Sequence, residues 1–147
     1  MIKLGRQFGT KLKGGEVIEL LGDVGVGKTT FTKGLALGLG IKETINSPSF
    51  TVMKSYLARD ELTLNHYDFY RLDDAGIMKS EIAESLNNPR VITVVEWAKD
   101  VAGVLPENRQ IIEIKYLSDG EGRETIMGRS AHSSVSDNVA GSRKNIE

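Results

Sequence analysis

The stretch GDVGVGKTTF, residues 22–31, directly follows an apolar run, VIELL. Its Gly-x4-Gly-Lys-Thr spacing is met by Gly22, Gly27, Lys28 and Thr29, which is the pattern of a phosphate-binding loop. Glycines let successive backbone N–H groups converge on an anion, and the N-terminus of the following helix adds positive potential. The alternative is a glycine-rich turn with an incidental lysine. The preceding strand and following helix favour the phosphate site.

The positions of this loop predict a nucleotide and a metal ion. Lys28 would reach the β- and γ-phosphates, and the Thr29 hydroxyl would ligate Mg²⁺. The sequence lacks the Asn-Lys-x-Asp tetrapeptide that reads guanine, which favours ATP over GTP. We therefore expect ATP and Mg²⁺ as cofactors, held by Gly22, Asp23, Val24, Gly25, Val26, Gly27, Lys28, Thr29 and Thr30.

Two carboxylates follow predicted strands and are candidates for catalysis. Glu96 ends the apolar run VITVV, and Asp68 lies in HYDFYRL at the end of another strand. Acids at the carboxyl ends of parallel strands converge where such sheets bind ligands. Glu96 is the candidate for the second magnesium ligand beside Thr29, since P-loop hydrolases take this ligand from a strand-end carboxylate. The alternative is a solvated glutamate at a strand end. Lys28, Asp68 and Glu96 are the predicted catalytic residues.

Three further features leave alternatives open. Ser47–Thr51 (SPSFT) carries hydroxyls on a stiff turn, where other P-loop hydrolases place a switch loop, but an ordinary proline turn has the same composition. His66 is interpreted as structural rather than catalytic. Arg71 could pair with an acid or with phosphate.

Hydrophobic periodicity predicts alternating helices and strands. Gly34 and Gly38 lie inside a predicted helix, where each costs about 1 kcal/mol relative to alanine, so another element is expected to pack closely there. The predicted helices cover residues 2–13, 28–40, 77–86 and 98–104. The predicted strands are 17–21 and 91–95, with hairpins formed by 51–57 with 62–69 and by 111–116 with 124–127.

Composition limits the class of protein. The chain has 147 residues, of which 39% are hydrophobic and 27% charged, which is ordinary for one globular domain. The net charge of −1 gives no sign of an independent nucleic-acid or membrane surface. The absence of cysteine rules out disulfides and thiolate sites. No signal-like or membrane-spanning run is visible, so a cytoplasmic location is expected.

The order of the motifs resembles one family, TsaE, the bacterial ATPases required for tRNA threonylcarbamoyladenosine biosynthesis. The matching stretches are GDVGVGKTTFTKGLALGLG, SPSFT, HYDFYRL, VVEWA and LPE, and the resemblance in their order and approximate spacing covers residues 5–127. The phosphate loop alone would not separate families. Its combination with the other four stretches is specific to this one.

The resemblance implies an α/β fold: a small P-loop NTPase-type three-layer fold with a mainly parallel central sheet plus antiparallel hairpins. It also implies a weak Mg²⁺-dependent ATPase that acts with the proteins TsaD and TsaB. In that system TsaD transfers threonylcarbamoyl to the adenosine beside the anticodon, and ATP hydrolysis by TsaE is thought to reset the complex. Contact of this chain with tRNA would then be indirect, and no membrane contact is expected.

The resemblance also assigns residues. It gives phosphate and magnesium roles to Lys28 and Thr29, the second magnesium role to Glu96, and a role in hydrolysis to Asp68. Trp97 falls beside the site. The loop at residues 120–123 falls on the adenine side, which adds Gly122 and Arg123 to the predicted nucleotide contacts.

The chain departs from the family pattern at two places. It begins almost inside the first helix, where family members carry a further N-terminal strand, so either the start is truncated or mis-called, or the adenine pocket is built differently. Ser49 replaces the commoner threonine but keeps the hydroxyl. We expect a P-loop ATPase domain over residues 1–127 and a disordered polar tail over 128–147, where Ser, Asn and Gly are frequent.

Two other functions compete with an ATPase subunit. A small-molecule P-loop kinase would normally bring an arginine-rich lid over the phosphates, and no such insertion is visible in the sequence. A nucleotide-binding scaffold with vestigial hydrolysis is the third possibility. A Glu96→Gln variant that still supported tRNA modification would favour that scaffold.

Overall fold

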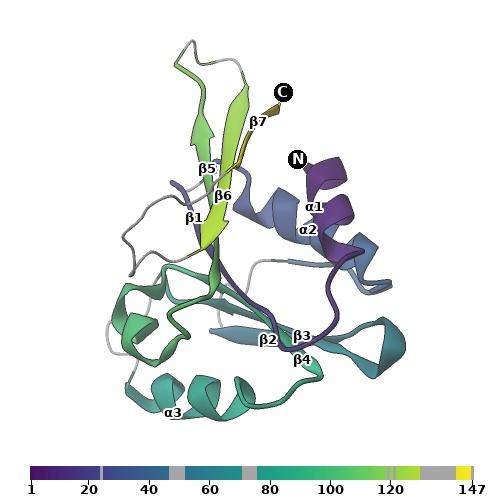
Figure 1. Cartoon of the computed structure of the whole chain (residues 1–147), viewed down its shortest axis with the longest axis vertical. Coiled ribbons are helices and arrows are strands. Elements are labelled where there is room, and N and C mark those ends of the chain that lie inside the picture. Colours follow the sequence, from purple (N-terminus) through teal and green to yellow (C-terminus); the bar gives the residue numbers. More distant parts are fainter. Residues whose placement is uncertain are drawn as a thin grey trace.

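A computed structural model describes residues 1–23, 25–46, 52–70, 76–118, 120, 122–129 and 142–146 (Figure 1). Its helices are α1 (Ile2–Gly9), α2 (Lys28–Gly38) and α3 (Gly76–Ser85), with short 3₁₀ helices η1 (Arg59–Glu61) and η2 (Ala98–Val104). Its strands are β1 (Val17–Leu21), β2 (Met53–Leu57), β3 (Thr63–Asp68), β4 (Val91–Glu96), β5 (Gln110–Tyr116), β6 (Arg123–Arg129) and β7 (Ser142–Ile146).

All seven strands form one sheet in the order β2-β3-β4-β1-β5-β6-β7. The four central strands are parallel, and β2, β6 and β7 join the two sides in antiparallel pairs. This confirms the predicted α/β fold with a parallel centre and antiparallel hairpins. The register pairs Glu96 with Asp68 on one side and with Leu20 on the other. The carboxyl ends of β3, β4 and β1 therefore meet at one edge, directly before the phosphate loop.

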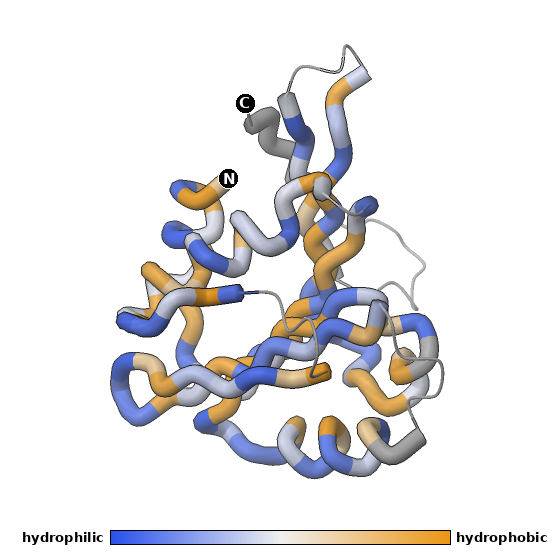
Figure 2. The backbone as a smooth tube through the Cα atoms, turned by 180° about the vertical axis from the view of Figure 1, so that it is seen from behind, coloured by the Kyte–Doolittle hydropathy of each residue, from blue (hydrophilic) through white to orange (hydrophobic). Residues whose placement is uncertain are grey.

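Alternation along the central strands builds a separate core on each face of the sheet. Ile18 and Leu20 of β1, with Leu64 of β3, pack in the cluster that contains the α2 side chains Phe31 and Leu35. The other cluster includes Val17, Tyr67 and Val95 from the strands, Phe69 directly after β3, and Ile82 of α3 and Val101 of η2. Helices accordingly lie on both sides of the strands (Figure 1), and hydrophobic stretches gather in the strands between them (Figure 2).

Helices α1 and α2 pack so closely that glycine is required on both. A Cβ on Gly34 would overlap the backbone oxygen of Ile2, and one on Gly38 would overlap that of Arg6. Likewise, a Cβ on Gly5 or Gly9 of α1 would overlap backbone oxygens of α2. The close packing predicted from the two glycines of α2 is thus confirmed, and its partner is the N-terminal helix.

Arg59, in the turn between β2 and β3, binds the ends of both helices. Its guanidinium donates to the carbonyl oxygens of Gly9 at 3.0 Å, Leu12 at 3.0 Å and Gly38 at 3.3 Å. A cation that satisfies the last carbonyls of a helix also complements the helix dipole. Arg59 therefore links the hairpin to the carboxyl ends of α1 and α2.

The structure shortens two predicted helices. The helix expected over 2–13 ends at Gly9, because the carbonyls beyond it accept hydrogen bonds from Arg59 rather than continuing the helix. The helix expected over 28–40 ends at Gly38, and Gly40 follows with a φ of +70°. The N–H groups of Gly40 and Ile41 bond back to the carbonyls of Leu37 and Ala36, which is the Schellman pattern that glycine favours.

The expected polar tail, residues 128–147, differs from the structure in part. Strand β6 continues through Arg129, and Ser142–Ile146 forms β7 against it. Strand β7 pairs with the edge of β6 through backbone groups, which does not require apolar side chains. The polar composition of this segment therefore gave no sign of a strand. Residues 130–141 and 147 lie outside the described part. Across the described residues, no helix combines the length and apolarity needed to cross a bilayer.

The contact between α1 and α2 can be tested by adding one methyl group. Gly34→Ala should lower the free energy of unfolding by about 1–3 kcal/mol, because the methyl meets backbone atoms that cannot move independently. Gly103→Ala in η2 is the matched control, since a Cβ there meets nothing within 4 Å. Urea denaturation of both variants measures the difference. Equal stability would contradict the close contact.

Candidate functional site

The loop between β1 and α2 has the backbone that its glycines predict. Gly22, Gly25 and Gly27 have φ angles of +147°, +83° and +117°, all in the left-handed half of the map. Gly27 is the N-cap of α2, and no side chain caps the helix there. The first N–H groups of a helix have no intrahelical partner, so α2 presents donors and positive potential to the loop.

Carbonyl groups of the loop are bonded within the protein. The Lys28 ammonium donates to the Gly22 oxygen at 2.6 Å. From the β5–β6 hairpin, the Tyr116 hydroxyl donates to the Gly25 oxygen at 3.0 Å, and Arg123 Nε donates to the Val26 oxygen at 2.6 Å. These contacts hold the loop around the N-terminus of α2, whose first N–H groups are the donors that a phosphate site requires.

Lys28 is a buried cation at the centre of the site. Its side chain is only 6% exposed, and its ammonium lies 3.9 Å from Glu96 Oε1 and 3.9 Å from the centre of the Trp97 ring. Burial lowers the pKa of the Lys28 ammonium from its usual range, against the opposing effect of the Glu96 and Asp68 carboxylates. Two acids and one aromatic face therefore hold this charge beside the loop.

The two predicted acids occupy paired positions at the ends of β3 and β4. Glu96 is 3% exposed, and its Oε2 accepts a hydrogen bond of 2.7 Å from His66 Nε2. Asp68 is partly exposed, and its Oδ1 accepts the N–H of Tyr70 at 3.0 Å. The predicted convergence of the two strand ends is confirmed, and the buried position of Glu96 argues against a merely solvated glutamate.

Trp97 reaches Lys28 because the chain turns sharply after β4. Its φ of 56° and ψ of 52° are left-handed, which is uncommon for a bulky residue without glycine's freedom. The indole then lies against the Lys28 ammonium, and its ring centre is 4.8 Å from that of Tyr70. Such backbone outliers concentrate at functional sites, where the surroundings hold them.

The remaining predicted residues are placed as follows. Thr29 and Thr30 lie in the first turn of α2, both partly exposed, and Asp23 is exposed near Lys28. Arg123 lies over the Tyr116 ring at 5.0 Å, and the Gly122 oxygen accepts the N–H of Leu117 at 2.9 Å. The predictions for Val24, Ser47–Thr51 and Arg71 lie outside the described residues.

Comparison with known proteins agrees with this geometry. The family model described as "Threonylcarbamoyl adenosine biosynthesis protein TsaE" matches residues 1–125. The chain belongs to the TsaE family. The match includes the loop, both strand-end acids and the Tyr116–Arg123 side of the site, so the resemblance drawn from the motifs is confirmed.

Relatives and a solved structure extend the comparison of this TsaE-family chain. The tRNA threonylcarbamoyladenosine biosynthesis protein TsaE of Treponema pallidum is 41% identical over 83% of the chain and 89% of its own length. The protein of the same name from Bacillus subtilis is 42% identical over 74% of the chain and 67% of its own length. The crystal structure of Bacillus subtilis YdiB superposes with a TM-score of 0.68 at 34% identity, covering 88% of this chain and 78% of that one.

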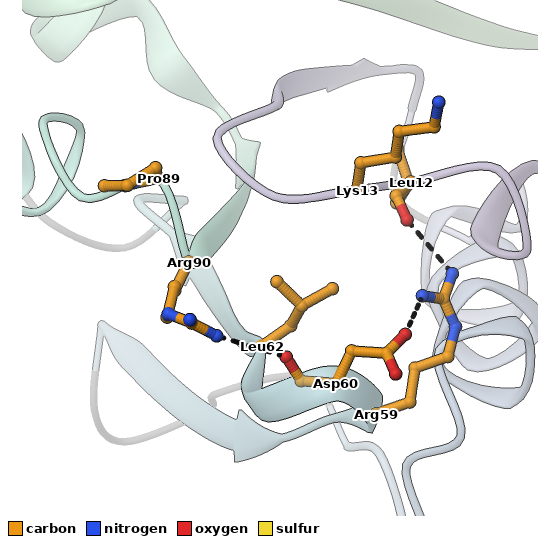
Figure 3. Close-up of a pocket in the computed structure, with 7 residues that line it drawn as sticks. All are labelled: Leu12, Lys13, Arg59, Asp60, Leu62, Pro89 and Arg90. Carbon is orange, nitrogen blue, oxygen red and sulfur yellow. Dashed lines mark hydrogen bonds and ion pairs between the residues drawn. The ribbon is translucent and has the colours of Figure 1, made fainter.

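A cavity of about 430 Å³ lies away from the nucleotide loop of this TsaE-family fold. It opens where β1, β3 and β4 begin, whereas sheets of this type bind ligands where parallel strands end. Figure 3 shows Arg59 and Arg90 at its wall, each bonded to Asp60. The guanidinium of Arg59 already donates to carbonyl oxygens at the ends of α1 and α2. We therefore interpret this cavity as a structural feature and not as a ligand site.

Two contributors to the site were missed or underestimated from the sequence. Tyr116 was not predicted at all, although its hydroxyl holds the loop. His66 was interpreted as structural, yet it contacts a candidate magnesium ligand. The HxD spacing places His66 and Asp68 on one face of a strand, which was the available signal for His66. Tyr116 gave no such signal, because only the β1–β5 pairing brings it to the loop.

Proposed function

We propose that this chain is a Mg²⁺-dependent ATPase subunit that serves threonylcarbamoyladenosine modification of tRNA. The observation that carries the proposal is the buried Lys28 beside a glycine loop and two strand-end carboxylates, in a chain of the TsaE family. The two relatives from Treponema pallidum and Bacillus subtilis carry that biosynthesis in their names.

The residues fit a magnesium–nucleotide complex. Backbone N–H groups of residues 22–30 would bind phosphate oxygens, and Lys28 would exchange the Gly22 oxygen for the β- and γ-phosphates. Thr29 and Glu96 supply the oxygen ligands that Mg²⁺ prefers, and phosphates and waters complete its shell. Bound Mg²⁺ supplies charge neutralisation at the phosphates. Asp68 would orient the attacking water. Gly122 and Arg123 would face the adenine side.

We further propose that the partners are TsaD and TsaB, and that these partners provide the main contact with tRNA. The net charge of −1 gives no sign of an independent RNA-binding face, which would normally be basic. Isolated P-loop hydrolases are often slow until a group in trans completes the site. Tyr70, 53% exposed and beside Trp97, gives the nucleotide edge an aromatic contact for a partner.

Removing the charge of Lys28 should weaken nucleotide binding. Lys28→Met keeps the length of the side chain but loses a charge-assisted contact to phosphate, so ATP affinity should fall about tenfold to a hundredfold. Lys33→Met, on the exposed side of α2, is the matched control and should bind ATP like the wild type. Titration calorimetry measures both. Unchanged affinity in Lys28→Met would overturn the loop assignment.

Neutralising either acid should affect hydrolysis more than binding. Glu96→Gln removes a magnesium ligand while keeping its shape, so phosphate release should fall about tenfold or more while ATP still binds. Asp68→Asn should behave alike. Phosphate release is measured without a phosphoryl acceptor, which also separates an ATPase from a kinase. A variant that hydrolyses ATP at the wild-type rate removes its residue from the catalytic set.

Binding to the TsaD–TsaB complex should depend on the nucleotide. Capture of this chain on the immobilised complex should be stronger with a non-hydrolysable ATP analogue than with ADP or no nucleotide. Tyr70→Ala should weaken capture, whereas Leu57→Ala should not, because Leu57 is 72% exposed at the opposite end of the β2–β3 hairpin. Equal capture in all three nucleotide states, or tight tRNA binding by this chain alone, would exclude the model.

A further inference from the structure

His66 and Glu96 form a buried pair beneath the nucleotide loop. His66 is fully buried and Glu96 is 3% exposed, so neither group exchanges its hydrogen bonds freely with water. The 2.7 Å distance between Nε2 and Oε2 is that of a strong, charge-assisted hydrogen bond. An ionised carboxylate only accepts hydrogen bonds, so the imidazole donates its Nε2–H to Glu96.

The sheet itself produces this contact. His66 and Asp68 lie two residues apart on β3 and share a face, and Asp68 pairs with Glu96 of β4. The same face carries Leu64 and Val94 in the core beneath α2. The imidazole therefore approaches Glu96 from the interior of the sheet, one step below the strand ends.

The two oxygens of Glu96 have different environments. Oε2 is held by His66, while Oε1 faces the Lys28 ammonium at 3.9 Å, beyond hydrogen-bond distance. A carboxylate fixed through one oxygen has its second oxygen presented in a defined direction. The second oxygen, Oε1, is therefore directed toward Lys28, at the proposed phosphate site.

We propose that His66 is a positioning residue that orients the Glu96 carboxylate for Mg²⁺. This inference rests on the proposed function, in which Glu96 is a magnesium ligand. Groups that hydrogen-bond a metal ligand fix its orientation, and losing one typically costs about tenfold to a hundredfold in metal affinity. A histidine that only filled the core would affect stability but not the magnesium requirement.

The test compares three substitutions of His66. His66→Gln can place an amide N–H near the position of Nε2, His66→Asn is too short to reach Glu96, and His66→Leu fills space without a donor. Binding of a fluorescent, non-hydrolysable ATP analogue is titrated with MgCl₂, and binding in EDTA and thermal melting are measured alongside. The Mg²⁺ concentration for half-saturation should rise about tenfold in the Asn and Leu variants and return close to wild type in the Gln variant.

A double substitution separates this inference from the proposed function. In a Glu96→Gln background, His66→Asn should cause no further rise in the Mg²⁺ requirement, because the oriented carboxylate is already gone. If Glu96→Gln raises the requirement but Asn and Gln at position 66 behave alike, the His66 inference is wrong and the function stands. If the wild type shows no Mg²⁺-dependent binding, the proposed function itself fails. Should the Leu variant not fold, the Asn–Gln comparison decides.

Discussion

The ammonium group of Lys28 is buried, and the surrounding residues provide the polar and aromatic contacts that replace its hydration. Taking an ion out of water costs several kcal/mol unless partners replace the lost hydration. Here the Gly22 carbonyl, the Glu96 carboxylate and the Trp97 ring lie around it. Glu96 is buried as well, and His66 provides its hydrogen bond. The loop, β4 and β3 are thus joined through one set of polar contacts.

This arrangement depends on parallel pairing in the centre of the sheet. Strands β1, β3 and β4 all end at the same edge, so their last residues arrive together although they are far apart in the chain. The sharp left-handed turn at Trp97 then returns the indole to the loop. An antiparallel β4 would place Glu96 at the other edge, beside the cavity that opens where the strands begin.

The position of α2 is fixed from outside the site. Glycines on α1 and α2 allow backbone contact between the two helices, and Arg59 binds the carboxyl ends of both. Because Lys28 begins α2, a helix held at its far end also holds the loop at its near end. The β5–β6 hairpin completes the support through Tyr116 and Arg123, which occupy loop carbonyls. The contacts that stabilise the fold therefore also fix the position of the loop.

The sequence by itself determined the local elements and the family. Several features could be predicted because each depends on residues close together in the chain. These are the glycine spacing of the loop, the acids that directly follow apolar strands, the glycines inside α2, and the hairpins. The ends of the helices were predicted less accurately. Helix α1 ends at Gly9 because Arg59, about 50 residues later in the chain, donates hydrogen bonds to the carbonyls there. Strand β7 was missed because edge pairing uses backbone groups that composition does not reveal. Only the tertiary structure decided that His66 touches Glu96 and that Tyr116 holds the loop, since both contacts depend on which strands lie side by side.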